Sequence, residues 1–108
     1  MLYKFKSKAS GDLIMLEPNG RRMLEIIGKL SDDGRGILQP AQMPAAIAAL
    51  QAAIAQEEAQ RQALAAEARA RGDAEAPVEG VSLRQRATPF IDMLRRCQQA
   101  EKDIVWGV

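Results

Sequence analysis

The sequence predicts an α+β fold. We expect a small two- or three-stranded antiparallel sheet with adjacent N- and C-terminal strands, packed by a short helix, one long helix and a Pro-kinked C-terminal helix. Residues 2–7 and 103–108 place apolar side chains at every second position, which is the period of a strand. Residues 45–71 consist almost entirely of strong helix formers and contain neither Gly nor Pro. Helices packed on one face of the sheet would bury its apolar side.

The segment after the first strand is compatible with two structures. Gly11 and Asp12 offer a turn, and residues 13–16 form an apolar run that ends at a second predicted turn, residues 17–20. A hairpin partner for the first strand is the simplest interpretation of residues 13–16. Four apolar residues are equally compatible with the start of a helix.

A short helix is predicted over residues 21–27, with Asn19 as its cap. Gly28 stands where a left-handed C-terminal residue is wanted. Residues 31–36 predict a loop, and residues 37–38 form an apolar connection to the next element.

The long helix is predicted over residues 45–71, which corresponds to a length of about 40 Å. Pro40 and Pro44 lie in or just before first helical turns, where a missing N–H costs little. Glu57 and Arg61 stand where a continuous apolar seam would need Leu or Ile, so we expect the N-terminal half to dock and the C-terminal half to project as an arm. Four apolar residues at helical spacing are the candidate interaction surface: Ile47, Leu50, Ile54 and Leu64.

Residues 72–80 predict a flexible acidic linker inside a single domain of residues 1–108. Ser82 and Gln85 then have the spacing of a capping box. Pro89 must disturb the helix that begins there, by a kink or by a restart with Thr88 as cap.

The apolar face of this C-terminal helix consists of Leu83, Ala87, Phe90, Ile91, Leu94 and Cys97. It could cover the seam of the long helix within one chain, in which case no partner would be needed.

In the last strand, Ile104, Trp106 and Val108 share a face. Trp106 offers the largest single buried area, so we expect this strand to belong to the core.

Composition excludes several classes of function. The 108 residues carry 15 Lys and Arg against 14 Asp and Glu, which argues against a protein that lives on nucleic acid or an anionic membrane. His, the commonest acid/base residue and metal ligand, is absent, and one Cys cannot form an internal disulfide. Without an apolar span or a secretory signal, the chain is predicted to be cytoplasmic.

No motif points to catalysis or to a cofactor. Residues 31–42 have the length of a calcium-binding EF-hand loop, but their ligand positions offer only one acidic residue, Asp33, beside Ser31, a cationic Arg35 and a neutral Gln42. Cys97 has no His to act as its base and lies on an apolar face, which favours a packing role. Asp32 and Asp33 are adjacent, as are Glu57 and Glu58, and adjacent carboxylates do not converge on a substrate. We therefore predict a protein that is not an enzyme, with no metal and no cofactor.

Four segments are similar to a small proteobacterial family known as domain of unknown function 1840. They are residues 5–9, 42–47, 80–94 and 105–108. The resemblance covers essentially the whole chain, and its motifs concern packing and turns. It implies a single-domain bacterial cytoplasmic protein and brings no activity, ligand or catalytic residue with it.

The sequence thus favours a small non-catalytic interaction or structural module. The long helix would supply its contact surface, and the partner would be a second copy in a homodimer or another protein. The alternative is a weak binder of nucleic acid or an anionic ligand. It would use four arginines that point in several directions around the C-terminal helix, Arg84, Arg86, Arg95 and Arg96.

Overall fold

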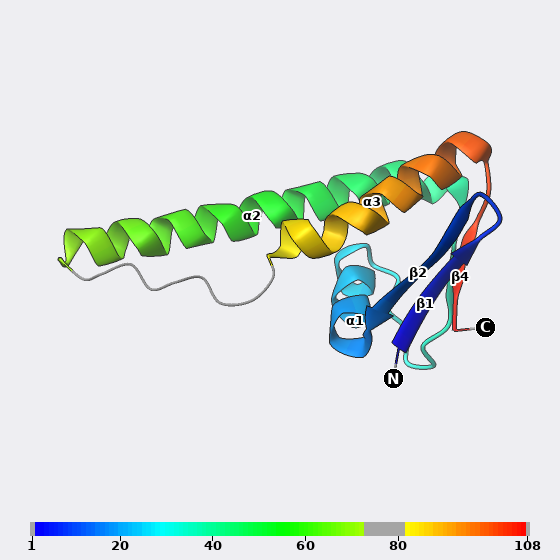
Figure 1. Cartoon of the computed structure of the whole chain (residues 1–108), viewed down its shortest axis with the longest axis horizontal. Helices are drawn as coiled ribbons and strands as arrows, with labels where there is room; N and C mark the ends of the chain where they lie inside the picture. The colour runs from blue at the N-terminus through cyan, green and yellow to red at the C-terminus, as the bar shows by residue number, and fades with distance from the viewer. Residues whose placement is uncertain (1, 73–81, 108) are drawn as a thin grey trace.

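The computed structural model describes residues 2–72 and 82–107, which contain four strands and three α-helices (Figure 1). The strands are β1 (Leu2–Ser7), β2 (Ser10–Leu16), β3 (Gly36–Leu38) and β4 (Ile104–Trp106). The helices are α1 (Glu17–Ile26), α2 (Met43–Ala70) and α3 (Leu83–Ala100), and a 3-10 turn, η1 (Pro40–Gln42), precedes α2. The predicted α+β class is confirmed.

The strands form one antiparallel sheet in the order β2-β1-β4-β3. β1 pairs with β2 from Leu2 opposite Leu16 to Ser7 opposite Ser10, and it meets β4 where Lys6 lies opposite Val105. The N-terminal and C-terminal strands are therefore adjacent, as predicted. The sheet has more strands than the predicted two or three, because residues 36–38 pair with β4 and are not merely a connection.

The first hairpin turns earlier than predicted. Its turn lies at residues 8–9, where the backbone N–H of Ala9 donates to the Ser7 hydroxyl at 3.3 Å. Gly11 and Asp12 belong to β2, so the turn predicted there is wrong. Residues 13–16 continue β2, which resolves the choice between strand and helix in favour of the strand.

The turn predicted at residues 17–20 is also wrong, because α1 begins at Glu17 and Leu16 occupies its cap position. Pro18 lies in the first helical turn, where its missing N–H would have had no partner in the helix. Asn19 is thus inside the helix and not its cap. Gly20 packs against Tyr3, since a Cβ there would lie 2.6 Å from the Tyr3 ring. Gly28 has a φ of 75°, as the prediction for the end of this helix required.

The C-terminal helix, α3, confirms the predicted capping box and excludes one of the two alternatives at Pro89. The Ser82 hydroxyl accepts from the backbone N–H of Gln85 at 3.2 Å, and Gln85 Oε1 accepts from the backbone N–H of Ser82 at 3.0 Å. α3 runs through Pro89 as one helix, so a restart at Thr88 is wrong. The Thr88 hydroxyl donates instead to the carbonyl oxygen of Arg84 at 2.6 Å.

The helices cover one face of the sheet, and a single apolar cluster lies between them. Phe5 lies at its centre, with its ring 4.8 Å from that of Phe90 and 5.6 Å from that of Trp106. Trp106 is fully buried, which confirms that the last strand belongs to the core. The predicted linker, except for Gly72, and Val108 lie outside the described residues.

Candidate interaction surface

The structure divides the four predicted seam residues between two places. Leu50 and Ile54 are buried, and Ile47 is half-buried against the same core. Leu64 lies farther along α2 and is 65% exposed. The first part of α2 therefore packs within the chain, where α2 and α3 run side by side (Figure 1).

Glu57 closes the packed part of α2, because its carboxylate joins three elements. Oε1 accepts from the backbone N–H of Leu83 at 3.2 Å, at the first turn of α3. Oε2 lies 3.2 Å from an Arg22 guanidinium nitrogen on α1, and Oε1 lies 2.9 Å from that of Arg61. A carboxylate at a helix N-terminus satisfies a free N–H and interacts favourably with the helix dipole. The charged residue that interrupts the apolar seam thus stands where α3 begins.

Glu58 makes the second link between α2 and α3. Its oxygens lie 2.6 and 3.0 Å from two nitrogens of the Arg84 guanidinium, which is a bidentate ion pair. Hydrogen bonding from Arg84 holds the pKa of the Glu58 carboxyl below its ordinary value, and Glu58 raises the pKa of Arg84 in turn. Because both side chains are exposed, salt screens this pair.

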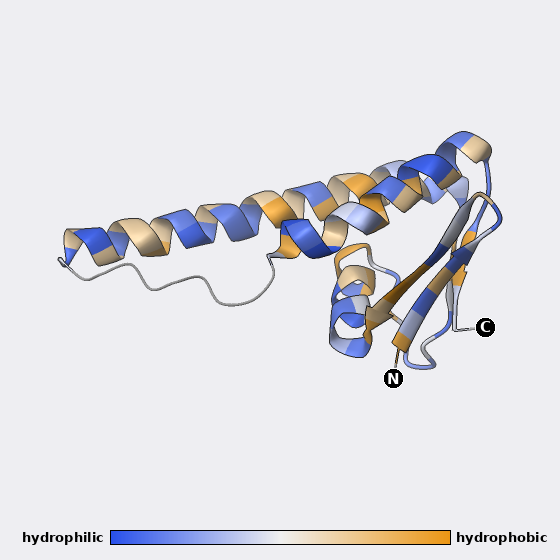
Figure 2. Ribbon diagram, viewed as in Figure 1, coloured by the Kyte–Doolittle hydropathy of each residue, from blue (hydrophilic) through white to orange (hydrophobic). Residues whose placement is uncertain are grey.

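Beyond these links α2 continues as a projection that we call the distal arm (residues 59–71). Among the described residues, no side chain of the distal arm is buried. Figure 2 shows hydrophilic and weakly hydrophobic positions alternating along it. One ion pair within the arm joins Arg71 to Glu67 at 4.0 Å, and Arg61 pairs back to Glu57. The described residues extend 52 Å along the longest axis of the molecule.

The four arginines of the alternative hypothesis do not gather in one patch. Arg84 and Arg95 line a depression between α2 and α3, whereas Arg96 lines a different one beside the start of β2. Arg84 is engaged by Glu58. An anion between α2 and α3 would therefore meet Arg95 and an Arg84 that Glu58 already engages, with Arg96 in a different depression.

The other candidates for chemistry have structural roles. Cys97 is buried, and its sulfur lies 3.2 Å from the Ser7 hydroxyl. In the loop at residues 31–35, Asp33 accepts from the backbone N–H of Arg35 at 3.1 Å and lies 2.8 Å from the Ser31 hydroxyl. These hydrogen bonds lower the pKa of Asp33 and close the loop on itself. Within residues 2–72 and 82–107, no three His, Cys, Asp or Glu side chains are grouped as metal ligands would be.

One surface escaped the sequence analysis, namely the face of the sheet turned away from the helices. Four large apolar side chains are exposed there or at its edge: Leu2, Ile14, Leu16 and Ile37. An apolar run of four residues in a strand must place two side chains on each face. Once residues 13–16 are assigned to a strand, their sequence therefore predicts two apolar side chains on the open face.

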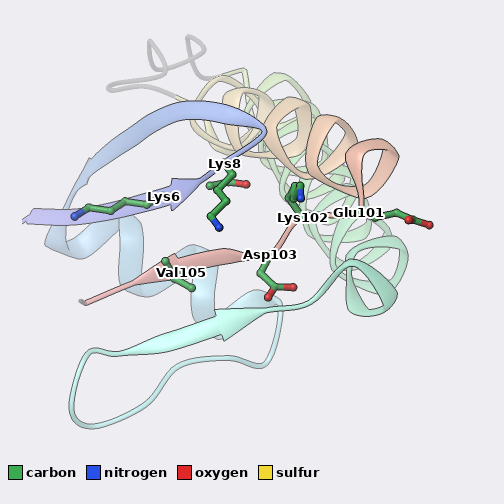
Figure 3. A pocket seen from close by; sticks show the side chains of 7 residues that line it. Lys6, Lys8, Glu101, Lys102, Asp103 and Val105 are labelled. Carbon is green, nitrogen blue, oxygen red and sulfur yellow. The ribbon is translucent and has the colours of Figure 1, made fainter.

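A hollow of about 600 Å³ lies at one end of this face, where the hairpin diverges from β4 (Figure 3). In Figure 3, Lys8 extends toward the space beside Asp103 and Val105, while the side chain of Glu101 points away from it. The lining contains three lysines and two acidic residues, Lys6, Lys8, Lys102, Glu101 and Asp103. Because the lining carries charges of both signs, it does not indicate whether a ligand would be an anion or a cation.

Among the described residues, no helix has the length and apolar character needed to cross a membrane. Searches of the curated proteins and of the solved structures returned no match. The family model described as Domain of unknown function (DUF1840) matches residues 1–106. The chain therefore belongs to this family, which confirms the resemblance seen in its sequence.

Proposed function

We propose that this chain is a non-catalytic protein-interaction module that uses the distal arm of α2 as its contact surface. The observation that carries the proposal is the continuation of α2 well past Ile54, its last buried side chain. Helices in water draw most of their stability from packing of an apolar face. The distal arm carries Leu64 at 65% exposure without a buried face of its own. A partner that covers Leu64 would supply the missing packing.

The placement of Glu57 supports a role for the arm beyond the needs of the core. α3 begins beside Glu57, and the ion pairs of Glu57 and Glu58 complete the link between the helices. The core thus requires α2 only as far as this junction. The residues beyond it carry charges of both signs, three Arg and one Glu, around the exposed Leu64, which is compatible with a protein partner.

Site-specific photo-crosslinking tests the proposal. A benzophenone amino acid replaces Leu64 in the full chain, expressed in its native host, and a second variant carries it at Gln99, which is exposed on α3. We expect protein adducts at position 64 and none above background at position 99. Equal yields at the two positions, or no adduct at position 64, would contradict the proposal.

A further inference from the structure

We infer that the partner of the distal arm is a second copy of this chain, paired antiparallel to it about Leu64. The inference rests on the proposed function and names the partner of the same surface. It is carried by the order of three residues at equal spacing along the arm: Arg61, Leu64 and Glu67. A cation, an apolar side chain and an anion succeed one another, and all three lie within about 60° of Leu64 around the helix.

An antiparallel arrangement makes this order self-complementary. When the two-fold axis passes beside Leu64, each Leu64 meets its copy, and each Arg61 stands at the height of Glu67 on the other chain. The symmetry produces the attractive pair twice. A parallel arrangement would instead place Arg61 beside Arg61 and Glu67 beside Glu67, which is repulsive. The order of Arg61 and Glu67 therefore makes the arm complementary to a second copy of itself and favours the antiparallel direction.

The ion pairs and the exposure of the arm's side chains are compatible with this pairing. The ion pairs of Arg61 and Glu67 run along their own helix, Arg61 to Glu57 and Glu67 to Arg71. Both pairs involve flexible side chains that can share a second partner. None of the arm's described side chains is buried in its own chain.

The expected dimer is weak. Two helices that overlap for about three to four turns bury less than the roughly 1,200 Å² at the low end of specific interfaces. Only one large apolar residue from each chain lies at the centre of the contact. We therefore expect a dissociation constant on the order of 100 μM.

Disulfide trapping in the full chain tests the two-fold axis directly. Leu64→Cys places one thiol from each copy at the axis, whereas Ala68→Cys lies one turn along the same face and serves as the matched control. Copies of residue 68 would be about 12 Å apart along the helix axis, beyond the Cα separation of a disulfide, about 4.4–6.8 Å. The native Cys97 is buried and does not compete.

Under mild oxidation at about 100 μM protein, we expect Leu64→Cys to form a covalent dimer at least about fivefold faster than Ala68→Cys. Equal rates would indicate a parallel pairing or random collision and would overturn the inference. If neither variant dimerises while the photo-crosslinker at position 64 captures another protein, the second copy is the wrong partner and the proposed function stands. If position 64 forms no adduct either, both fail.

Charge reversal separates contacts between chains from contacts within one chain. Arg61→Glu should weaken self-association about tenfold, and adding Glu67→Arg should restore it to within about threefold of the native value. The double variant loses both ion pairs within its own helix, so recovery requires attraction between chains. Sedimentation equilibrium measures the dissociation constants, and circular dichroism confirms the helix content. A double variant as weak as Arg61→Glu would overturn the inference.

Discussion

The backbone N–H of Leu83 donates a 3.2 Å hydrogen bond to the Glu57 carboxylate, although the two residues belong to different helices. This contact attaches the start of α3 to the side of α2. It also explains why a charged residue occupies a position that helical spacing assigns to an apolar one. The free N–H groups of a helix N-terminus need acceptors. The Ser82 hydroxyl accepts from the N–H of Gln85, and Glu57 accepts from that of Leu83.

Replacing Glu57 should destabilise the whole fold. Glu57→Ala removes the acceptor for Leu83 and the ion pair to Arg22, so the free energy of unfolding should fall by about 1–2 kcal/mol. Glu57→Gln keeps an acceptor oxygen and should cost about half as much. Urea denaturation followed by the fluorescence of Trp106 measures both losses.

Glu67→Ala is the control, because Glu67 is exposed and its ion pair to Arg71 measures 4.0 Å. It should leave the free energy of unfolding unchanged within about 0.5 kcal/mol at concentrations where the chain is monomeric. Equal losses at positions 57 and 67 would show that the link to α3 contributes nothing.

Gly36 is required by packing and not by its backbone conformation. A Cβ at Gly36 would lie 2.6 Å from Trp106 Cε2, whereas a Cβ at Gly11, in β2, would meet nothing within 4 Å. Gly36→Ala should therefore cost about 1–3 kcal/mol, and Gly11→Ala should change stability by less than about 1 kcal/mol. Thermal unfolding of the two variants compares them. Similar melting temperatures would contradict the close contact.

Trp106 is fully buried, and its Nε1–H has no hydrogen-bond partner among the described residues. An unpaired buried donor is unfavourable, so Trp106→Phe removes a penalty while it opens a small void. We expect a net loss below about 2 kcal/mol for Trp106→Phe and about 3–5 kcal/mol for Trp106→Ala. Chemical denaturation followed by circular dichroism distinguishes them, and equal losses would indicate that Nε1 is bonded.

The ion pair between Arg84 and Glu58 predicts a dependence of stability on pH. Because the pKa of Glu58 is lowered in the folded protein from an ordinary value of 4.5, the pair stabilises the fold above pH 4.5. This contribution is lost as the pH falls through the lower pKa of the folded state. The urea midpoints of the native chain and Arg84→Gln should thus differ at pH 7 and converge as the pH falls below 4.5. A difference between the midpoints that does not change with pH would contradict a stabilising ion pair. At pH 7, added salt should reduce the difference.

Local patterns were enough to predict the elements whose stability is local. The capping box at Ser82 and the long run of helix formers in α2 depend on neighbours in the sequence, and both were predicted from it. Residues 36–38 could not be predicted as a strand, since three residues show too little alternation and pair only because β4 lies beside them. The start of α1 was misjudged because Pro18 and Gly20 favour turns, although Pro suits a first helical turn and Gly20 makes room for Tyr3.

The candidate site was predictable only in part for the same reason. The periodicity that links Leu50 to Leu64 is a property of one helix. How far α3 extends along that helix depends on which residue begins α3. Glu57 marks that point, but its role becomes visible only when Leu83 is placed beside it. The apolar residues on the open face of the sheet needed the register of β1 and β2, which no local pattern specifies.

The sheet order β2-β1-β4-β3 places β1 next to β4, which is synthesised last of the four strands. During synthesis of α2 and α3, one edge of the β1–β2 hairpin has no partner strand. Lys6 can pair only after Val105 has been synthesised. Contacts so distant in sequence form slowly. Until β4 is available, the open edge of β1 can therefore pair with strands of other chains.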